Sequence, residues 1–246
     1  MPPSARKSRL AAFTKNRTNP AYVGARLGAD RVAARLGCAL AHHVPETPDD
    51  VAEQRALLEA VLAEGADAIL LAPTHATALD DLLRRAEADG IPIVCFVSRP
   101  ADIAPACFVG SDDRALARGI ADHLFDRLAA GGDVVTIEGH PNSMTTAPRA
   151  AGFRDAAAAR REVRIKGARA GDYQRDGGRV AMAELMAAEP RIDGVLAAND
   201  FMALGALDAM REAGRKIPIV GVNATPEGIA AITAGDMLAP PPRSTP

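Results

Sequence analysis

The sequence predicts an α/β protein made of two lobes, each a doubly wound parallel sheet with helices packed on it. Short apolar runs, typical of strands, alternate along the chain with longer stretches whose apolar residues recur at helical spacing. This alternation occurs twice, with a looser stretch after Pro100 between the two series. The length of 246 residues fits two domains of roughly 100–150 residues each.

The predicted strands are short and lack strict alternation of apolar and polar residues, which indicates that both faces of each sheet are covered. They are residues 10–14, 38–42, 68–71 and 93–97 with a short run at 108–109 in the first lobe, and residues 134–138, 163–168, 195–198 and 219–222 in the second. Strands separated by helices form parallel sheets through right-handed crossovers.

Helices are predicted from apolar spacing and from residues that start or stop a helix. In the stretch 47–65, Thr47 suits the N-cap, Pro48 the first helical position and Gly65 the stop. Further helices are predicted over 115–128, 180–188 and 202–213.

The elements group into an N-terminal lobe over residues 1–110, a C-terminal lobe over 111–237 and an irregular, proline-rich tail over 238–246. We expect a hinge near residues 109–111. Two open parallel sheets that face each other place the loops at their carboxyl ends around a shared cleft.

Composition and charge exclude several function classes. Hydrophobic residues make up 48% of the chain and charged residues 24%, as in a globular protein with a core. Lysine and arginine number 29 against 31 aspartates and glutamates, so we expect no nucleic-acid partner. No apolar segment of roughly 7–15 residues follows the basic residues 1–9, so the chain as given shows no secretory signal peptide.

Sequence motifs of catalysis are absent from the chain. There is no Gly-x-Gly-x-x-Gly after a strand, no Walker-type loop, no Gly-x-Ser-x-Gly and no His-Glu-x-x-His. The cysteines have no Cys-x-x-Cys spacing, and the adjacent His42 and His43 point to opposite faces of a strand, which is poor geometry for a shared metal. We therefore expect no catalytic residue, metal or cofactor, and predict that the protein is not an enzyme.

Polar side chains follow the predicted strands at their carboxyl ends. They are Asn19, Ser98 and Arg99 in the first lobe, and Arg149, Asn199 and Asn223 in the second. Arginine offers a fork of donors, and asparagine offers one acceptor and two donors, which suits the hydroxyls of a sugar or polyol. Helix capping is the alternative for Asn19 and Asn199, since both precede helices.

Both tyrosines, Tyr22 and Tyr173, fall at loop or helix-start positions, one in each lobe. A ring laid on the C–H face of a sugar buries apolar area while neighbouring loops supply polar contacts. The alternative is a half-buried tyrosine that packs a loop. With the six polar residues, the two tyrosines complete the set of candidate ligand-binding residues.

Seven segments carry a family resemblance, namely residues 18–22, 91–94, 108–113, 149–153, 171–173, 198–206 and 220–226. In them the chain resembles the ribose-binding-like periplasmic substrate-binding proteins of bacterial ABC transporters, which have the type 1 periplasmic-binding fold. The resemblance covers about residues 10–238, and the string Asn-Asp-Phe-Met-Ala-Leu-Gly-Ala at 199–206 is its most specific part.

The resemblance implies a monomer in the periplasm or cell envelope that clamps a sugar or polyol between its lobes by hinge closure and docks on a membrane permease. It implies that Asn19, Tyr22 and Arg99 bind the ligand from the first lobe, with an early polar position at Lys15 or Asn16. It also implies contacts from the second lobe or hinge by Arg149, Tyr173, Asn199 and Asn223.

The sequence departs from the family pattern at several points. Ser98-Arg99 stands where relatives often have Asp-Arg, Val222-Asn223 where they often have Phe-Asp, and Ala21 where ribose binders have an aromatic residue. Fewer carboxylates weaken charge-assisted pairing, so a different sugar, a polyol or a less polar ligand is expected. We also expect the C-terminal crossover to be missing, which leaves apolar surface exposed on the first lobe.

Two other function classes occur on scaffolds of this kind. The ligand-sensing domain of a lactose-repressor-like regulator shares this fold, but about nine residues precede the first strand, so the chain as given has no room for a DNA-binding head. An enzyme on a flavodoxin-like or Rossmann-like scaffold needs a nucleophile or cofactor loop that the sequence does not show.

Overall fold

The computed structural model describes residues 6–128 and 130–238. The chain divides into two compact units, Met1–Ser111 and Asp112–Pro246, and each contains one parallel sheet. The predicted fold class is therefore confirmed. Of the tail predicted over 238–246, residues 239–246 lie outside the described residues.

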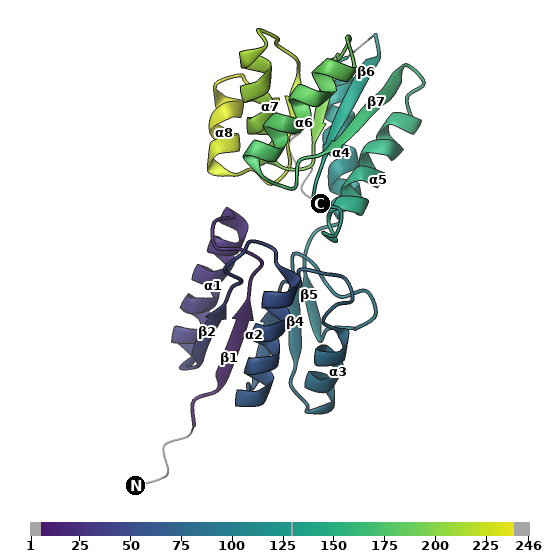
Figure 1. Ribbon diagram of the computed structural model, residues 1–246. Helices are drawn as coiled ribbons and strands as arrows, with labels where there is room; N and C mark the ends of the chain where they lie inside the picture. The colour runs from purple at the N-terminus through teal and green to yellow at the C-terminus, as the bar shows by residue number, and fades with distance from the viewer. Residues whose placement is uncertain (1–5, 129, 239–246) are drawn as a thin grey trace. The chain divides into compact units, whose positions relative to one another are not determined.

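The N-terminal unit is an alternation of strands and helices around a sheet of order β2-β1-β3-β4-β5, with all neighbouring strands parallel (Figure 1). Its elements are β1 (Arg9–Phe13), α1 (Pro20–Leu36), β2 (Ala39–His43), α2 (Val51–Glu64), β3 (Ala68–Leu71), α3 (Asp80–Ala88), β4 (Ile93–Phe96) and β5 (Cys107–Val109). The step from β1 to β2 runs opposite to the later steps, so right-handed crossovers place α1 on one face and α2 and α3 on the other.

One face of this sheet forms the core of the unit. Alternate strand residues such as Phe13, Ile69, Leu71 and Cys95 are fully buried there against α2 and α3. The strand residues between them point to the opposite face, as the pleat requires.

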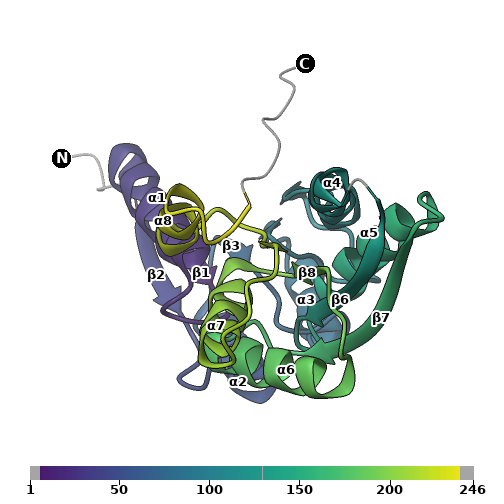
Figure 2. The same ribbon diagram turned by 90° about the horizontal axis from the view of Figure 1, so that it is seen from above.

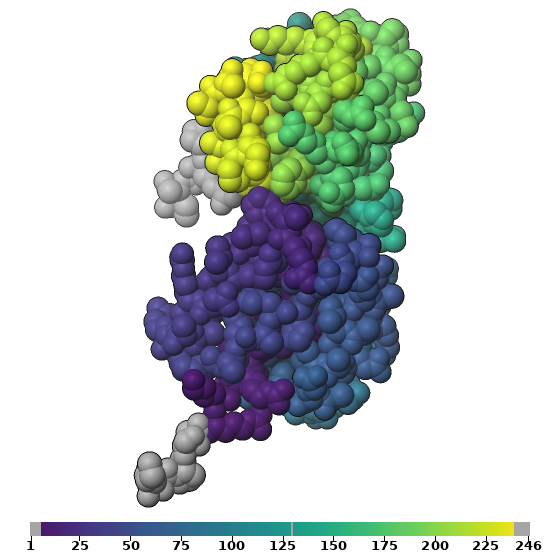
Figure 3. Space-filling model, turned by 60° about the vertical axis from the view of Figure 1, so that its left-hand side comes forward, coloured from purple at the N-terminus to yellow at the C-terminus, as the bar shows by residue number. Residues whose placement is uncertain are grey.

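The opposite face of the N-terminal sheet is open beside α1. Leu70, Val94 and Phe96 are only half-buried there, and they line a groove of about 610 Å³ whose wall includes Gly28 and Val32 of α1. Figure 3 shows α1, in purple, on the surface of this unit. The prediction of exposed apolar surface on the first lobe is confirmed, whereas the expectation that both faces of this sheet are covered is wrong for the α1 face.

The C-terminal unit repeats the same winding with a sheet of order β7-β6-β8-β9, again all parallel. Its elements are α4 (Asp113–Arg127), β6 (Gly132–Glu138), α5 (Thr146–Ala158), β7 (Val163–Ala170), α6 (Arg175–Ala188), β8 (Gly194–Ala197), α7 (Asp200–Glu212), β9 (Ile219–Val220) and α8 (Pro226–Thr233). In this winding α5 corresponds to α1, α6 to α2 and α7 to α3.

Both faces of the C-terminal sheet are covered. Helices α4 and α5 lie side by side, and so do α6 and α7 (Figure 2). The neighbouring Val134 and Val135 of β6 point to opposite faces and are both fully buried in the core of this unit. Helix α4, which precedes β6, has no counterpart before β1 among the described residues of the N-terminal unit.

The predicted start of the second helix is wrong by a few residues. Helix α2 begins at Val51, and its N-cap is Asp50, whose side chain accepts from the backbone N–H of Glu53 at 2.8 Å. Asp49 has φ 63°, so the chain turns there and Pro48 stays outside the helix. The predicted stop at Gly65 is confirmed as the C-cap. Within residues 6–128 and 130–238, no helix has the length and hydropathy needed to cross a membrane.

Candidate functional site

Arg149, near the start of α5, is the centre of a polar network in the C-terminal unit. Its Nε donates to Asp113 Oδ1 at 2.7 Å, Nη1 to the carbonyl of Ala198 at 2.6 Å and Nη2 to Asn223 Oδ1 at 3.3 Å. The side chains of Arg149 and Asp113 are only 9% and 12% exposed. A guanidinium has about five N–H donors, so these bonds leave further donors for a ligand.

Tyr173 and Asn199 belong to the same network. The guanidinium carbon of Arg149 lies 5.9 Å from the ring centroid of Tyr173, within the range of a cation–π contact. Asn199 Nδ2 donates to the backbone carbonyl of Tyr173 at 3.1 Å, and its Oδ1 accepts from the N–H of Met202 at 2.8 Å as the N-cap of α7. The capping prediction for Asn199 is confirmed, and the four predicted residues of this unit lie in one cluster.

Strained backbone occurs in three of the loops that carry predicted binding residues, two in the C-terminal unit and one in the N-terminal unit. Asp172 and Tyr173 have φ 53° and 62°, Asn223 and Ala224 have φ 113° and 55°, and Val97 has φ 63°. Non-glycine residues in this region cost about 1–3 kcal/mol each and persist where the surroundings over-determine them, often at ligand sites. All five follow the carboxyl ends of β7, β9 and β4, where the sequence predicted binding residues.

Asn19 and Tyr22 lie at the start of α1 in the N-terminal unit. The Asn19 side chain caps α1 by accepting from the backbone two residues on, at 2.9 Å, so the capping prediction is confirmed here too. The Asn19 N–H donates to Asn16 Oδ1 at 2.9 Å, and Asn16 Nδ2 donates to Asp49 Oδ2 at 3.2 Å. Asn16 and Tyr22 are both buried.

Ser98 and Arg99 follow β4 and contact other neighbours. The buried hydroxyl of Ser98 donates to the carbonyl of Pro73 at 3.1 Å, and the guanidinium carbon of Arg99 lies 5.4 Å from the ring centroid of Phe108. Among the described contacts, the hydrogen bonds of Asn19 and Ser98 therefore do not form one cluster, unlike those of the C-terminal unit.

The sequence-based prediction missed several residues of the network around Arg149. Asp113 pairs with Arg149 across 36 positions of sequence, and Thr145 and Thr146 contact the hydroxyl of Tyr173. Asp113 ends one of the family-like segments, which is the signal that could have found it. The threonines follow no strand directly and carry no motif.

Asp200, next to Asn199, has a structural role. Its Oδ2 accepts from the backbone N–H of Thr225 at 2.6 Å and so connects the start of α7 to the loop before α8. Burial is the largest influence on this carboxyl and raises its pKa above the ordinary value, against the opposing effect of the Thr225 hydrogen bonds.

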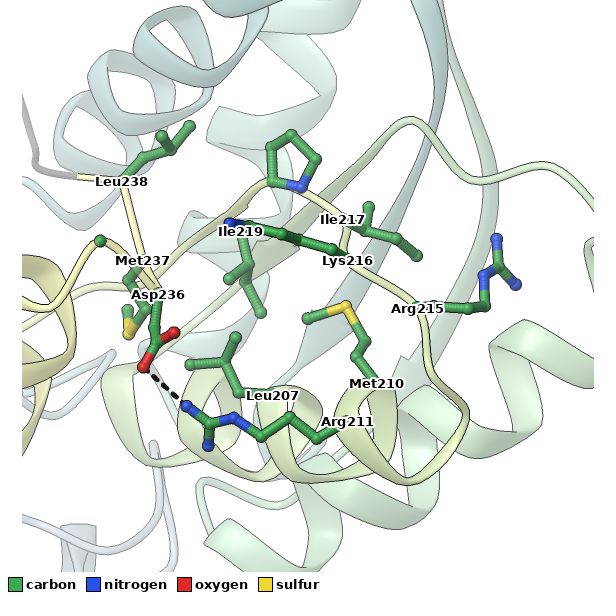
Figure 4. A pocket seen from close by; sticks show the side chains of 12 residues that line it. Leu207, Met210, Arg211, Arg215, Lys216, Ile217, Ile219, Asp236, Met237 and Leu238 are labelled. Atoms are coloured by element: carbon green, nitrogen blue, oxygen red, sulfur yellow. Dashed lines mark hydrogen bonds and ion pairs between the residues drawn. The ribbon is translucent and has the colours of Figure 1, made fainter.

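Two further features lie apart from the predicted residues. A hollow of about 410 Å³ beside β9 is lined by the end of α7 and by residues 235–238, and Arg211 Nη2 meets Asp236 Oδ2 there at 2.6 Å (Figure 4). None of the predicted ligand-binding residues lines it.

Within the part of the chain that the structure describes, no group of three or more His, Cys, Asp or Glu side chains is arranged to hold a metal ion.

Comparison with known proteins shows the family to which this chain belongs. A model described as the periplasmic binding protein domain matches residues 10–239, nearly the whole chain. The chain belongs to the periplasmic binding protein family. The ribose import binding protein RbsB of Bacillus subtilis is 30% identical over 224 residues, which cover 91% of this chain and 71% of that protein.

Solved structures of the periplasmic binding protein family agree with the fold. An ABC transporter solute-binding protein from Actinobacillus succinogenes with bound D-allose matches with a TM-score of 0.86 and 26% identity, covering 94% of this chain and 84% of that one. The Caulobacter myo-inositol binding protein bound to myo-inositol matches with a TM-score of 0.86 and 28% identity, covering 96% of this chain and 81% of that one. These relatives are binding proteins rather than enzymes.

Proposed function

We propose that this member of the periplasmic binding protein family captures a sugar or polyol and delivers it to an ABC-type permease in the cell envelope. The observation that carries the proposal is the cluster around Arg149, whose guanidinium is held by three acceptors and still has donors to offer. The relatives support it, since they are named for ribose, D-allose and myo-inositol.

The charge balance of the cluster supports an uncharged ligand. Asp113 lies 2.7 Å from the Arg149 guanidinium and neutralises it, so an anionic ligand gains little net attraction. Hydroxyl groups both donate and accept, and they match the arginine N–H donors and the amide groups of Asn199 and Asn223. Ligand contacts by Asn19, Tyr22, Ser98 and Arg99 of the N-terminal unit stay a prediction.

Calorimetry and thermal-shift measurements test this function with D-ribose, D-allose, xylitol and myo-inositol, and with ribose 5-phosphate as the anionic comparison. A true ligand at a hundredfold excess over its Kd stabilises the protein by about 2.7 kcal/mol. We expect a neutral compound of this panel to bind and the phosphate to bind at least about tenfold more weakly. Absence of binding across the neutral panel contradicts the proposal.

A pair of matched variants locates the binding. Asn223→Ala removes an acceptor of Arg149. We expect it to raise the Kd of the ligand at least about tenfold, the effect of losing a hydrogen bond to a charged group. Lys216→Ala changes an exposed residue before β9, at the opposite end of the strand that Asn223 follows, and serves as the control. Equal affinities of the two variants remove Asn223 from the site.

A further inference from the structure

The hydroxyl of Tyr173 lies in a chain of hydrogen bonds that connects two loops. Thr145 Oγ1 is 2.8 Å from the Tyr173 hydroxyl and 3.2 Å from Ser143 Oγ, and Thr146 Oγ1 is 3.1 Å from the Tyr173 hydroxyl and 2.7 Å from the carbonyl oxygen of His140. Tyr173 follows β7, whereas the other four residues precede or start α5.

Thr146 Oγ1 is the donor in both of its hydrogen bonds, to the carbonyl of His140 and to the hydroxyl of Tyr173. The carbonyl of His140 only accepts, and its distance of 2.7 Å from Thr146 Oγ1 is the shorter of the two. The Tyr173 hydroxyl accepts from Thr146, while either oxygen can be the donor between Tyr173 and Thr145 and between Thr145 and Ser143. Hydrogen bonds that form one network polarise and strengthen one another.

The ring of Tyr173 also packs against Gly139, where any larger residue would clash with it. A Cβ placed on Gly139, directly after β6, would overlap ring atoms of Tyr173, including Cζ. The backbone of Tyr173 is fixed as well, because Asn199 donates to its carbonyl at 3.1 Å and its φ is 62°. The side chain is therefore held at its hydroxyl, at its ring and at its backbone.

The contacts of Tyr173 help to fix the position of Arg149. Arg149 lies one turn after Thr145, and its N–H donates to the Thr145 carbonyl at 3.1 Å, so the Tyr173 hydroxyl fixes the turn from which the arginine projects. The Tyr173 ring lies 5.9 Å from the guanidinium carbon, while the three acceptors of Arg149 bind the edge of the guanidinium.

We propose that Tyr173 is a positioning residue that holds the guanidinium of Arg149 in place for the ligand. Its ring packs against Gly139, and its hydroxyl is fixed by the hydroxyls of Thr145 and Thr146. This inference rests on the proposed function and assigns Tyr173 a role through Arg149. A phenylalanine at this position keeps the ring and loses the connection to α5.

The first test needs no ligand. The Nε–H signal of Arg149, assigned by its loss in Arg149→Lys, is followed by NMR in Tyr173→Phe and in a control, Thr233→Val, which removes a hydroxyl that bonds only within α8. We expect Tyr173→Phe to shift this signal and to speed its exchange with water at least about tenfold, while the control leaves it in place. An unchanged signal in Tyr173→Phe overturns the inference whatever the protein binds.

The second test uses the neutral compound that binds most tightly in the calorimetric panel. We expect Tyr173→Phe to raise the Kd of this compound about five- to tenfold. Gly139→Ala should raise the Kd more, since the alanine displaces the whole ring of Tyr173. In the Arg149→Lys background, Tyr173→Phe should have less than half of this effect, because the group it positions is gone. Full additivity of the two changes overturns the positioning role, whereas a wild type that binds no neutral compound contradicts the proposed function alone.

Discussion

The two sheets of this protein share one winding and differ in how they are covered. In the C-terminal unit the neighbouring Val134 and Val135 are both fully buried, one on each face. In the N-terminal unit Ile69 is fully buried, while its neighbour Leu70 lines an open groove of about 610 Å³. The same topology thus supports a sheet with two covered faces and a sheet with one.

One glycine on each of the two corresponding helices, α5 and α1, illustrates the difference. Gly152 on α5 and Gly24 on α1 each lie four residues after a proline, Pro148 or Pro20, in helices that correspond in the two windings. A Cβ on Gly152 would overlap the backbone oxygen of Arg114 in α4, whereas a Cβ on Gly24 meets nothing within 4 Å. The glycine on α5 therefore permits close helix approach, whereas the glycine on α1 faces open space.

The largest expected effect concerns ion pairs of the two units. Arg149→Ala leaves the buried carboxylate of Asp113 without its partner, and we expect a loss of about 3–5 kcal/mol in unfolding free energy. Arg55→Ala breaks the exposed pair with Asp81 in the N-terminal unit and should cost far less. Urea unfolding followed by circular dichroism measures both losses of unfolding free energy. Equal losses would show that the two ion pairs contribute equally to stability despite their different burial.

Truncation of neighbouring residues on β3 tests the two faces of the N-terminal sheet. Ile69→Ala opens a cavity in the packed face and should cost about 2–5 kcal/mol. Leu70→Ala, on the open face, should cost less than about 1 kcal/mol, because water already reaches it. In β6, Val134→Ala and Val135→Ala should cost similar amounts. Equal losses at Ile69 and Leu70 would mean that the groove is closed in solution.

Alanine at Gly152 and alanine at Gly24 should have effects of opposite sign on stability. Gly152→Ala forces α4 away from α5 and is expected to destabilise the protein by about 1–3 kcal/mol. Gly24→Ala adds helix propensity in open space and should stabilise it by up to about 1 kcal/mol. Thermal melts of both variants provide the measurement, and a destabilised Gly24→Ala would contradict the open face.

The smallest perturbation is chemical labelling of the unmodified thiols of the N-terminal sheet. Burial raises the pKa of the Cys95 thiol to about 11, whereas Cys107 on the edge strand β5 is exposed. At pH 8 we expect Cys95 to react with a disulfide reagent at least about tenfold more slowly than Cys107. Mass spectrometry of the labelled peptides gives both rates, and similar rates would show that the packed face opens as easily as the edge.

Particular residues show how far the sequence predicts the site. Asn19, Asn199 and Asn223 stand in or just after the loops that follow strands, and parallel strands bring their carboxyl ends to one edge of a sheet. Arg149 lies farther along, inside α5, and belongs to the segment 149–153 that carries the family resemblance. The capping alternative proved true for both asparagines that precede helices, and for Asn199 it coexists with a place in the network. A local pattern thus identifies a position and leaves its several roles open.

The start of α2 shows a limit of local reasoning. Thr47 and Asp50 are both good cap residues by type, and the left-handed Asp49 between them decides in favour of Asp50. Thr47 instead donates its hydroxyl proton to Glu53 Oε1 at 2.8 Å. The competition between two valid caps is resolved by backbone geometry that residue type does not specify.

Apolar periodicity and helix stop signals are local and repeated in every element, so the sequence alone determined the order of strands and helices and the parallel α/β fold. Tertiary structure decided which apolar face is covered, since Ile69 and Leu70 have the same chemistry and differ only in what packs on them. It also decided that Arg149 meets Asp113 and Tyr173. Those contacts join residues far apart in the chain, and their distances are set by the packing of whole elements rather than by any local pattern.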